Sequence, residues 1–306
     1  MTDSPRLSVG IASRGRASSL ARCIAALELL DDMLDDVIVV DDGSTEPLEG
    51  PVRAALSAHA QRKLRIIRFD PSRGLAAARS TCVYEASSPW VLNLDDDAVV
   101  LTAEPMRLAL QTISADAGVF AIAFAQAQEN GEPWPAGAQP APVDYPCRVA
   151  SFIGFAHLVR RDAFVALGGF REQLMINGEE REMCLRALDA GLGVVYLPQA
   201  RVAHLADPAG RDVRHYLHLT VRNGVVSSIY DDPFALMCVR IPMRLVAYFR
   251  MRRGWNVTDP WGFWAVLRWI ARDVRRAFAQ RRPVRWSTIR RWRSLTRRAP
   301  AYRGPA

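Results

Sequence analysis

The sequence predicts an α/β fold with a mainly parallel sheet covered by helices on both faces, followed by a basic helical extension. Short apolar runs rich in β-branched residues alternate with stretches of helical periodicity through about the first 205 of 306 residues. This alternation is typical of parallel sheets. Residues 240–306 hold 18 arginines and two acidic residues, a net charge of +16, so residues 1–239 carry −8 of the overall +8. The two parts therefore differ in charge as well as in pattern.

The predicted elements follow one another in chain order. Strands are predicted at 7–12, 37–40, 64–69 and 90–94, with helices at 18–30 and 75–86. Farther along, we expect helices at 160–167 and 179–190 and short strands at 194–197 and 200–204. The proline-rich segment 127–148 has little periodicity and predicts a long surface loop. Ligands of such sheets bind beyond the carboxyl ends of the strands, where two acidic clusters lie.

The composition limits the classes of protein to which this chain can belong. Half of the residues are apolar and the mean hydropathy is near zero, which excludes a disordered or fibrous chain. We expect two domains, 1–225 and 226–306. The five cysteines form no CxxC pair and lie among apolar residues, as buried reduced thiols do. The sequence has no apolar run of 18 residues and no signal-peptide pattern at its start, so we expect a cytoplasmic protein.

The first acidic cluster is DDGST, residues 41–45, directly after the strand 37–40. Asp and Ser are common in turns and at helix N-caps, so the motif alone is compatible with a structural turn. A carboxylate here could instead accept hydrogen bonds from a base N–H and a ribose hydroxyl. Asp41 and Asp42 are therefore candidate nucleoside contacts.

The second cluster, Asp95, Asp96 and Asp97, ends the strand 90–94. Three adjacent carboxylates repel one another, and capping needs only one of them. Carboxylates at i and i+2 of an extended strand point to the same side, so Asp95 and Asp97 could share a cation. Mg²⁺ or Mn²⁺ with open positions for diphosphate oxygens suits this pattern. The alternative is a solvated acidic turn.

Two later features supply further candidates. Glu179, Glu180 and Glu182 lie in the first turn of the helix 179–190, where the helix dipole favours anions. They predict either an acidic helix start or a general base that faces a cleft. His204 ends the strand 200–204; such a histidine is usually structural, but a metal site elsewhere in the fold makes it a candidate ligand.

In this order and spacing the motifs resemble the family 2 glycosyltransferases of the GT-A fold, over about residues 6–224. LSVGIASRGR resembles the opening strand and turn, DDGST the nucleoside-binding strand end, and SRGLAAAR the Gly-rich helix entry. LDDD stands where the family has its metal motif, GEEREMCLRALDAG where it has its catalytic base, and LPQARVAHL where it has a late histidine. The nucleotide-sugar contacts that the resemblance implies are Ala12, Arg14, Asp41, Asp42, Arg73, Arg79, Asp95 and Asp96.

The resemblance implies an inverting transfer from a nucleotide-diphosphate sugar to a hydroxyl of a glycan, lipid-linked or small-molecule acceptor. Mn²⁺ or Mg²⁺ would bind at Asp95 and Asp97 with His204. The base would be Glu180, with Glu179 as the second candidate because this chain has Glu–Glu where the family usually has Glu–Asp. The alternatives are a catalytically idle GT-A domain that binds nucleotide sugars or acts as a scaffold, and a nucleotidyltransferase.

Residues 226–306 lie outside this resemblance and alternate large apolar residues with arginine at helical spacing. Trp261, Phe263, Trp264 and Leu267 form one side of a predicted helix, opposite Arg268, Arg272, Arg275 and Arg276. A basic amphipathic helix with Trp at its border predicts contact with an anionic membrane surface, here the inner face of the membrane. The alternative is a helical subdomain packed on the catalytic domain. No nucleic-acid motif accompanies the charge, so we predict no nucleic-acid partner.

Overall fold

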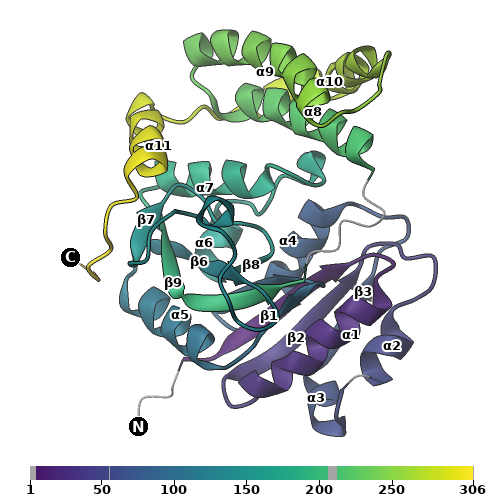
Figure 1. The fold of residues 1–306 in the computed structure, drawn as a ribbon, viewed down its shortest axis with the longest axis vertical. Helices are drawn as coiled ribbons and strands as arrows, with labels where there is room; N and C mark the ends of the chain where they lie inside the picture. Colours follow the sequence, from purple (N-terminus) through teal and green to yellow (C-terminus); the bar gives the residue numbers. More distant parts are fainter. Residues whose placement is uncertain (1–4, 55, 206–211, 306) are drawn as a thin grey trace.

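The computed structural model describes residues 5–54, 56–205 and 212–305, and its central feature is a mixed sheet (Figure 1). The strand order is β3-β2-β1-β4-β8-β6-β9-β5, and β7 pairs with β9. The strands are β1 Leu7–Ser13, β2 Leu34–Asp41, β3 Leu64–Arg68, β4 Trp90–Asp95, β5 Ala98–Val99, β6 Val119–Ala127, β7 Cys147–Val149, β8 Ala156–Arg160 and β9 Gly193–His204.

Parallel pairing organises the N-terminal half of the sheet. β1 pairs in parallel with both β2 and β4, β2 pairs in parallel with β3, and β6 pairs in parallel with β9. β8 runs antiparallel between β4 and β6. The α/β fold with a mainly parallel sheet is confirmed, and the carboxyl ends of β1, β2 and β4 lie side by side.

Helices cover both faces of the sheet, as the buried strands require. The helices are α1 Ala17–Ala25, α2 Glu49–Ala54, α3 Ala58–Lys63, α4 Leu75–Glu85, α5 Glu104–Ala115, α6 Arg161–Ala166, α7 Glu179–Asp189, α8 Val213–Asp231, α9 Phe234–Gly254, α10 Gly262–Ala279 and α11 Trp286–Arg298. Alternate residues of β2 point to opposite faces of the sheet. Val37 and Val39 belong to the core shared with α1 and α5. Ile38 and Val40 belong to the core shared with α4, α6 and α7.

Two expectations from the sequence need correction. The segments 194–197 and 200–204 form one strand, β9, which continues past Pro198 through a register irregularity opposite Phe124 and Ala125. Four of the five cysteines are buried, but Cys238 on α9 is exposed. The loop expected at 127–148 is largely irregular and contains a short 3-10 turn, Ala136–Ala138.

The C-terminal helices α8, α9 and α10 pack on one another in a layer beside the sheet domain (Figure 1). The position 225/226, where the sequence suggests a domain boundary, lies inside α8. α10 buries Val266 and Ala277, whereas Trp261 and Trp264 at its start are 75% and 63% exposed. α11 returns to α7, where Trp292 joins the core of the sheet domain. Among the described residues no helix combines the length and the apolar character that crossing a membrane requires.

Candidate active site

The sheet register brings the predicted motifs to one edge. Ala12 of β1 lies opposite Val40 of β2 on one side and Asp95 of β4 on the other. Ser13 lies opposite Asp41. The opening turn, the DDGST turn and the aspartate cluster therefore follow three adjacent strand ends.

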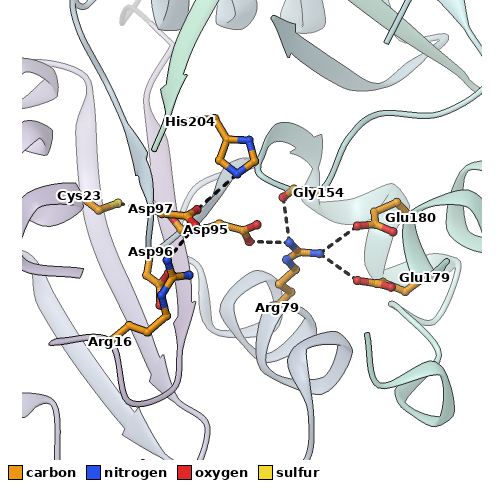
Figure 2. Close-up of polar contacts among 10 residues, drawn as sticks. All are labelled: Arg16, Cys23, Arg79, Asp95, Asp96, Asp97, Gly154, Glu179, Glu180 and His204. Atoms are coloured by element: carbon orange, nitrogen blue, oxygen red, sulfur yellow. Dashed lines mark hydrogen bonds and ion pairs between the residues drawn. The ribbon is translucent and has the colours of Figure 1, made fainter. Parts of the chain in front are cut away.

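The three aspartates occupy three different environments (Figure 2). β4 ends at Asp95, and Asp96 and Asp97 form a turn before β5, so the extended geometry expected for this tip is absent. The Asp95 carboxylate accepts a hydrogen bond from Arg79 Nη2 at 2.5 Å. Asp96 accepts from Ser13 Oγ at 2.6 Å, and Arg16 donates to both Asp96 and Asp97, at 2.7 and 3.0 Å.

Burial raises the pKa of Asp96 to about 6, although its bonds to Ser13 and Arg16 act in the opposite direction. Asp97 is also buried, and its Oδ1 accepts no hydrogen bond from any described residue. That oxygen lies 3.6 Å from Nε2 of His204. Asp97 and His204 are thus brought together as predicted, whereas Asp95 points to Arg79.

Arg79 of α4 is the centre of the site (Figure 2). Its buried guanidinium contacts Asp95, donates to Glu179 Oε1 at 3.0 Å and Glu180 Oε1 at 3.2 Å, and donates to the Gly154 carbonyl at 3.0 Å. Burial lowers the pKa of this guanidinium, but the three carboxylates outweigh burial and raise it overall. Arg79 thereby joins the strand-end aspartates to the start of α7.

The adjacent glutamates at the start of α7 differ in exposure. The Glu179 side chain is 1% exposed and its Oε2 has no hydrogen-bond partner among the described residues, whereas the Glu180 side chain is 19% exposed. Burial, and then the charge of Glu180, raise the pKa of Glu179 to about 8. Gly154 permits this close arrangement, because a Cβ there would lie 2.2 Å from Glu180 Oε1 and 2.7 Å from Arg79 Nη1.

The DDGST aspartates are engaged in building their own loops. Asp41 accepts from the backbone N–H groups of Ser44 and Leu48 and pairs with Arg68. Asp42 accepts from Ser72 Oγ and from the backbone N–H groups of residues 73 and 74, which fixes the turn that opens α4. In this structure both carboxylates therefore have the structural role considered for the motif.

The two exposed arginines predicted to contact the donor lie on loops at this edge. Arg14 is exposed in the opening turn, next to Gly15, whose N–H donates to Ser44 Oγ. Arg73 stacks over Phe69 at 4.7 Å and pairs with Glu172 at 2.8 Å. Both therefore lie outside the buried cluster around Arg79.

Sequence reasoning missed Ser13, Arg16 and Gln126. Ser13 and Arg16 belong to the opening turn, and only the parallel pairing of β1 with β4 reveals that they face the aspartates. Gln126 did carry a signal, since it is the one polar residue of the buried strand β6, VFAIAFAQA. Its Oε1 lies 2.5 Å from Nδ1 of His204.

No group of three ligating side chains converges on a metal position among the residues that the structure describes. Two donors nevertheless fit a divalent cation: the buried Asp97 Oδ1, without a hydrogen-bond partner in the described ranges, and the His204 Nε2 that faces it. Carboxylate and imidazole are suitable ligands for Mn²⁺, and carboxylate oxygen suits Mg²⁺.

Sequence comparison identifies similar proteins. Residues 8–166 match the family model for glycosyl transferase family 2. The chain is 30% identical over 216 residues to the pre-mycofactocin glycosyltransferase of Mycobacterium tuberculosis strain H37Rv, which covers 65% of this chain and 42% of that protein. It is 34% identical over 87 residues to the succinoglycan biosynthesis protein ExoU of Rhizobium meliloti, or 28% of this chain and 25% of ExoU. The matches therefore span less than half the length of these curated relatives.

Solved structures share the fold. The mannosyltransferase PcManGT from Pyrobaculum calidifontis, in complex with GDP-Man and Mn²⁺, aligns with a TM-score of 0.61 at 17% identity over 96% of this chain and 84% of that one. GalNAc-T7 with UDP, GalNAc and Mn²⁺ aligns with a TM-score of 0.63 at 17% identity over 91% of this chain and 59% of that one. At this identity the likeness shows the fold alone.

Proposed function

Because the chain belongs to glycosyl transferase family 2 and has the GT-A fold, we propose that it transfers a sugar from a nucleotide-diphosphate sugar to an acceptor hydroxyl, with inversion. One observation carries the proposal: Arg79 links the strand-end carboxylate of Asp95 to Glu180 at the start of α7. Donor-side and acceptor-side groups thus meet in one cluster. Family membership also argues against the nucleotidyltransferase alternative.

Glu180 is the base in this proposal. A general base must reach the acceptor hydroxyl and must be ionised to take its proton. Glu180 has the more exposed side chain, whereas Glu179 is enclosed and its raised pKa of about 8 keeps it largely protonated at neutral pH. Glu180 would remove the proton as the acceptor oxygen attacks the anomeric carbon from the face opposite the leaving diphosphate.

A divalent cation, Mn²⁺ or Mg²⁺, would be held by Asp97 and His204, with Asp95 as a further candidate if its carboxylate leaves Arg79. When bound, such an ion acts as a Lewis acid that stabilises the charge of the departing nucleoside diphosphate. Mn²⁺ in the structures of PcManGT and GalNAc-T7 supports this choice of cofactor class.

The donor would lie along the edge formed by the opening turn and the aspartates. We place its nucleoside and phosphates against Ala12, Arg14, Arg73 and Asp96, with Asp41 and Asp42 shaping the loops beneath. The acceptor would be a glycan, a lipid-linked glycan or a small molecule that enters beside Glu180.

Donor binding and turnover test this function together. A thermal-shift screen of UDP-, GDP- and dTDP-sugars with and without Mn²⁺ should reveal the donor, since a ligand at about 100 times its Kd stabilises a protein by about 2.7 kcal/mol. Release of the nucleoside diphosphate should follow, and should fall in Glu180→Gln. A shift without release in the presence of candidate acceptors would favour the idle binding domain.

We further propose that the C-terminal helices bring the enzyme to an anionic membrane surface. α9 leaves Val239, Met243 and Val246 more than half exposed, on the side opposite its packed residues. The rings of Phe249 and Phe263 are tilted by 36° with centroids 4.9 Å apart, and Phe263 contacts the exposed Trp264 edge to face, which continues this apolar surface. The net +16 charge of residues 240–306 complements anionic lipid headgroups. The buried side of α10 packs on α8, so the exposed side alone would contact lipid.

Vesicle sedimentation tests the membrane contact. We expect binding to vesicles that contain phosphatidylglycerol, weaker binding at high salt, and little binding to pure phosphatidylcholine. The double variant Met243→Ser/Val246→Ser should weaken binding by about a hundredfold or more, since burying each side chain is worth about 1.5–3 kcal/mol and each 1.4 kcal/mol is about tenfold. Leu108→Ser, at an exposed leucine of α5, is the matched control. Binding that is absent, or unaffected by salt and by the double variant, would favour a purely packed subdomain.

A further inference from the structure

Gln126 connects His204 to the proline-rich segment 127–148. Its side chain is buried at the end of β6, where Nε2 donates to the carbonyl of Ala138 and Oε1 lies 2.5 Å from His204 Nδ1. Its backbone is held by Gln139, which accepts from Gln126 N–H at 2.9 Å and donates to Gln126 O at 2.9 Å. Trp134 N–H also donates to Gln126 O, at 3.0 Å.

These contacts determine the tautomer of His204. A carbonyl oxygen can only accept, so Ala138 orients the Gln126 amide with its nitrogen toward the loop and its oxygen toward the imidazole. An amide oxygen also only accepts, so Nδ1 of His204 must carry the proton. In the neutral ring, Nε2 then has the lone pair.

The imidazole plane is fixed as well. His204 is stacked between Trp134, at 5.4 Å and 14°, and Phe155, at 4.8 Å and 20°. In this orientation Nε2 faces Asp97 Oδ1 at 3.6 Å. A lone pair and a carboxylate oxygen repel each other at this distance unless a cation or a proton lies between them. The arrangement is what two ligands of one metal ion require.

We propose that Gln126 is a positioning residue for the metal site, which holds His204 as the Nδ1–H tautomer so that Nε2 and Asp97 form two preset ligands. This inference rests on the proposed metal-assisted transfer. Outer hydrogen-bond acceptors of ligating histidines typically contribute 10–100-fold to metal affinity. By this proposal the segment 127–148 helps to position the metal ligands, because Trp134 stacks on His204 and Ala138 orients Gln126.

Mn²⁺ binding provides the first test, by electron paramagnetic resonance of free Mn²⁺ with and without UDP. Gln126→Leu should weaken Mn²⁺ binding by about 10–100-fold. Gln126→Glu, whose carboxylate still accepts from Nδ1–H but cannot donate to the Ala138 carbonyl, should bind Mn²⁺ more tightly than Gln126→Leu. Gln139→Leu removes loop contacts without touching His204 and controls for loosening of the segment. Equal binding by wild type and Gln126→Leu, or equal losses in Gln126→Leu and Gln139→Leu, would overturn the proposal.

A second measurement needs no substitution at Gln126. ¹⁵N NMR of histidine-labelled wild-type protein, with the His204 signals identified by their loss in His204→Asn, should show that Nδ1 carries the proton whenever the His204 ring is neutral. The opposite tautomer would overturn the positioning role while leaving the proposed transfer intact. A wild type that binds no Mn²⁺ and keeps full turnover with excess chelator would instead overturn the metal part of the proposed function, and this inference with it.

Discussion

The adjacent glutamates at the start of α7 should respond in opposite ways to the same chemical change. Glu180→Gln keeps the size of the side chain but cannot take a proton, so transfer should fall by about 10²–10⁴-fold. Donor affinity should change little, because this carboxylate is assigned to the acceptor. Glu179→Gln should retain most of the activity, since Glu179 is enclosed and Gln can still accept from Arg79.

The stability effect of Glu179→Gln follows from the pKa of Glu179, which burial raises from 4.5 to about 8. A carboxyl group whose pKa is higher in the folded state favours unfolding once it ionises. The contribution of Glu179 to the free energy of unfolding is therefore unchanged below pH 4.5, falls between pH 4.5 and 8, and is constant above pH 8. At about 1.4 kcal/mol for each pKa unit, the cost at pH 7 is on the order of 3 kcal/mol. Gln does not ionise and avoids this cost.

Urea unfolding of both proteins at pH 5 and pH 8 measures this difference directly. Glu179→Gln should exceed the wild type in stability much less at pH 5 than at pH 8, while nucleoside diphosphate release reports activity in parallel. A Glu179→Gln variant that loses stability at pH 8 would refute the electrostatic reasoning. Near wild-type transfer by Glu180→Gln together with an inactive Glu179→Gln would move the base to Glu179.

Two further substitutions probe the remaining parts of the site. Gly154→Ala places a Cβ against Glu180 and Arg79. We therefore expect a loss of turnover of about tenfold or more, and a stability loss of about 1–3 kcal/mol by urea unfolding. Gly137→Ala is the control and should behave as wild type, because a Cβ there has no neighbour within 4 Å. Asp97→Ala should abolish the part of the donor-induced thermal shift that depends on Mn²⁺. The variant should still fold, because Arg16 keeps its contact with Asp96. Full activity in excess chelator would exclude a metal role.

Much of the sheet could be predicted because its strands are short and apolar and are followed by turn residues. The run VIVV in β2 buries both of its faces, and DDGST follows it directly. Parallel strands bring their carboxyl ends to one edge, so the location of Asp41 and Asp95 at the same edge, on either side of β1, needed only the strand order. The continuation of β9 past Pro198 could not be predicted in the same way, because it depends on pairing with β6 across a register irregularity.

The partner of each acid could not be predicted, because identical side chains in DDD are distinguished by residues distant in sequence. Asp95 meets Arg79 from α4, and Asp96 meets Ser13 from the end of β1. The turn after β4 removes the i, i+2 relation on which the expected shared ion depended. For α10 the pattern showed an amphipathic helix, but periodicity does not reveal whether α8 or a membrane covers the apolar side.

The different environments of Glu179 and Glu180 are compatible with Glu–Glu at the motif that we propose to supply the base. Arg79 contacts three carboxyl groups, and three ionised ones would leave a net charge of −2 around a buried guanidinium. Protonation of the enclosed Glu179 leaves two carboxylates opposite one guanidinium, which lowers the repulsion that Glu180 experiences. The buried glutamate can then remain neutral, and its partly exposed neighbour is left for the proton exchange with the acceptor that we propose. A change that ionises Glu179 at neutral pH would therefore act on the base through Arg79, without any contact with substrate.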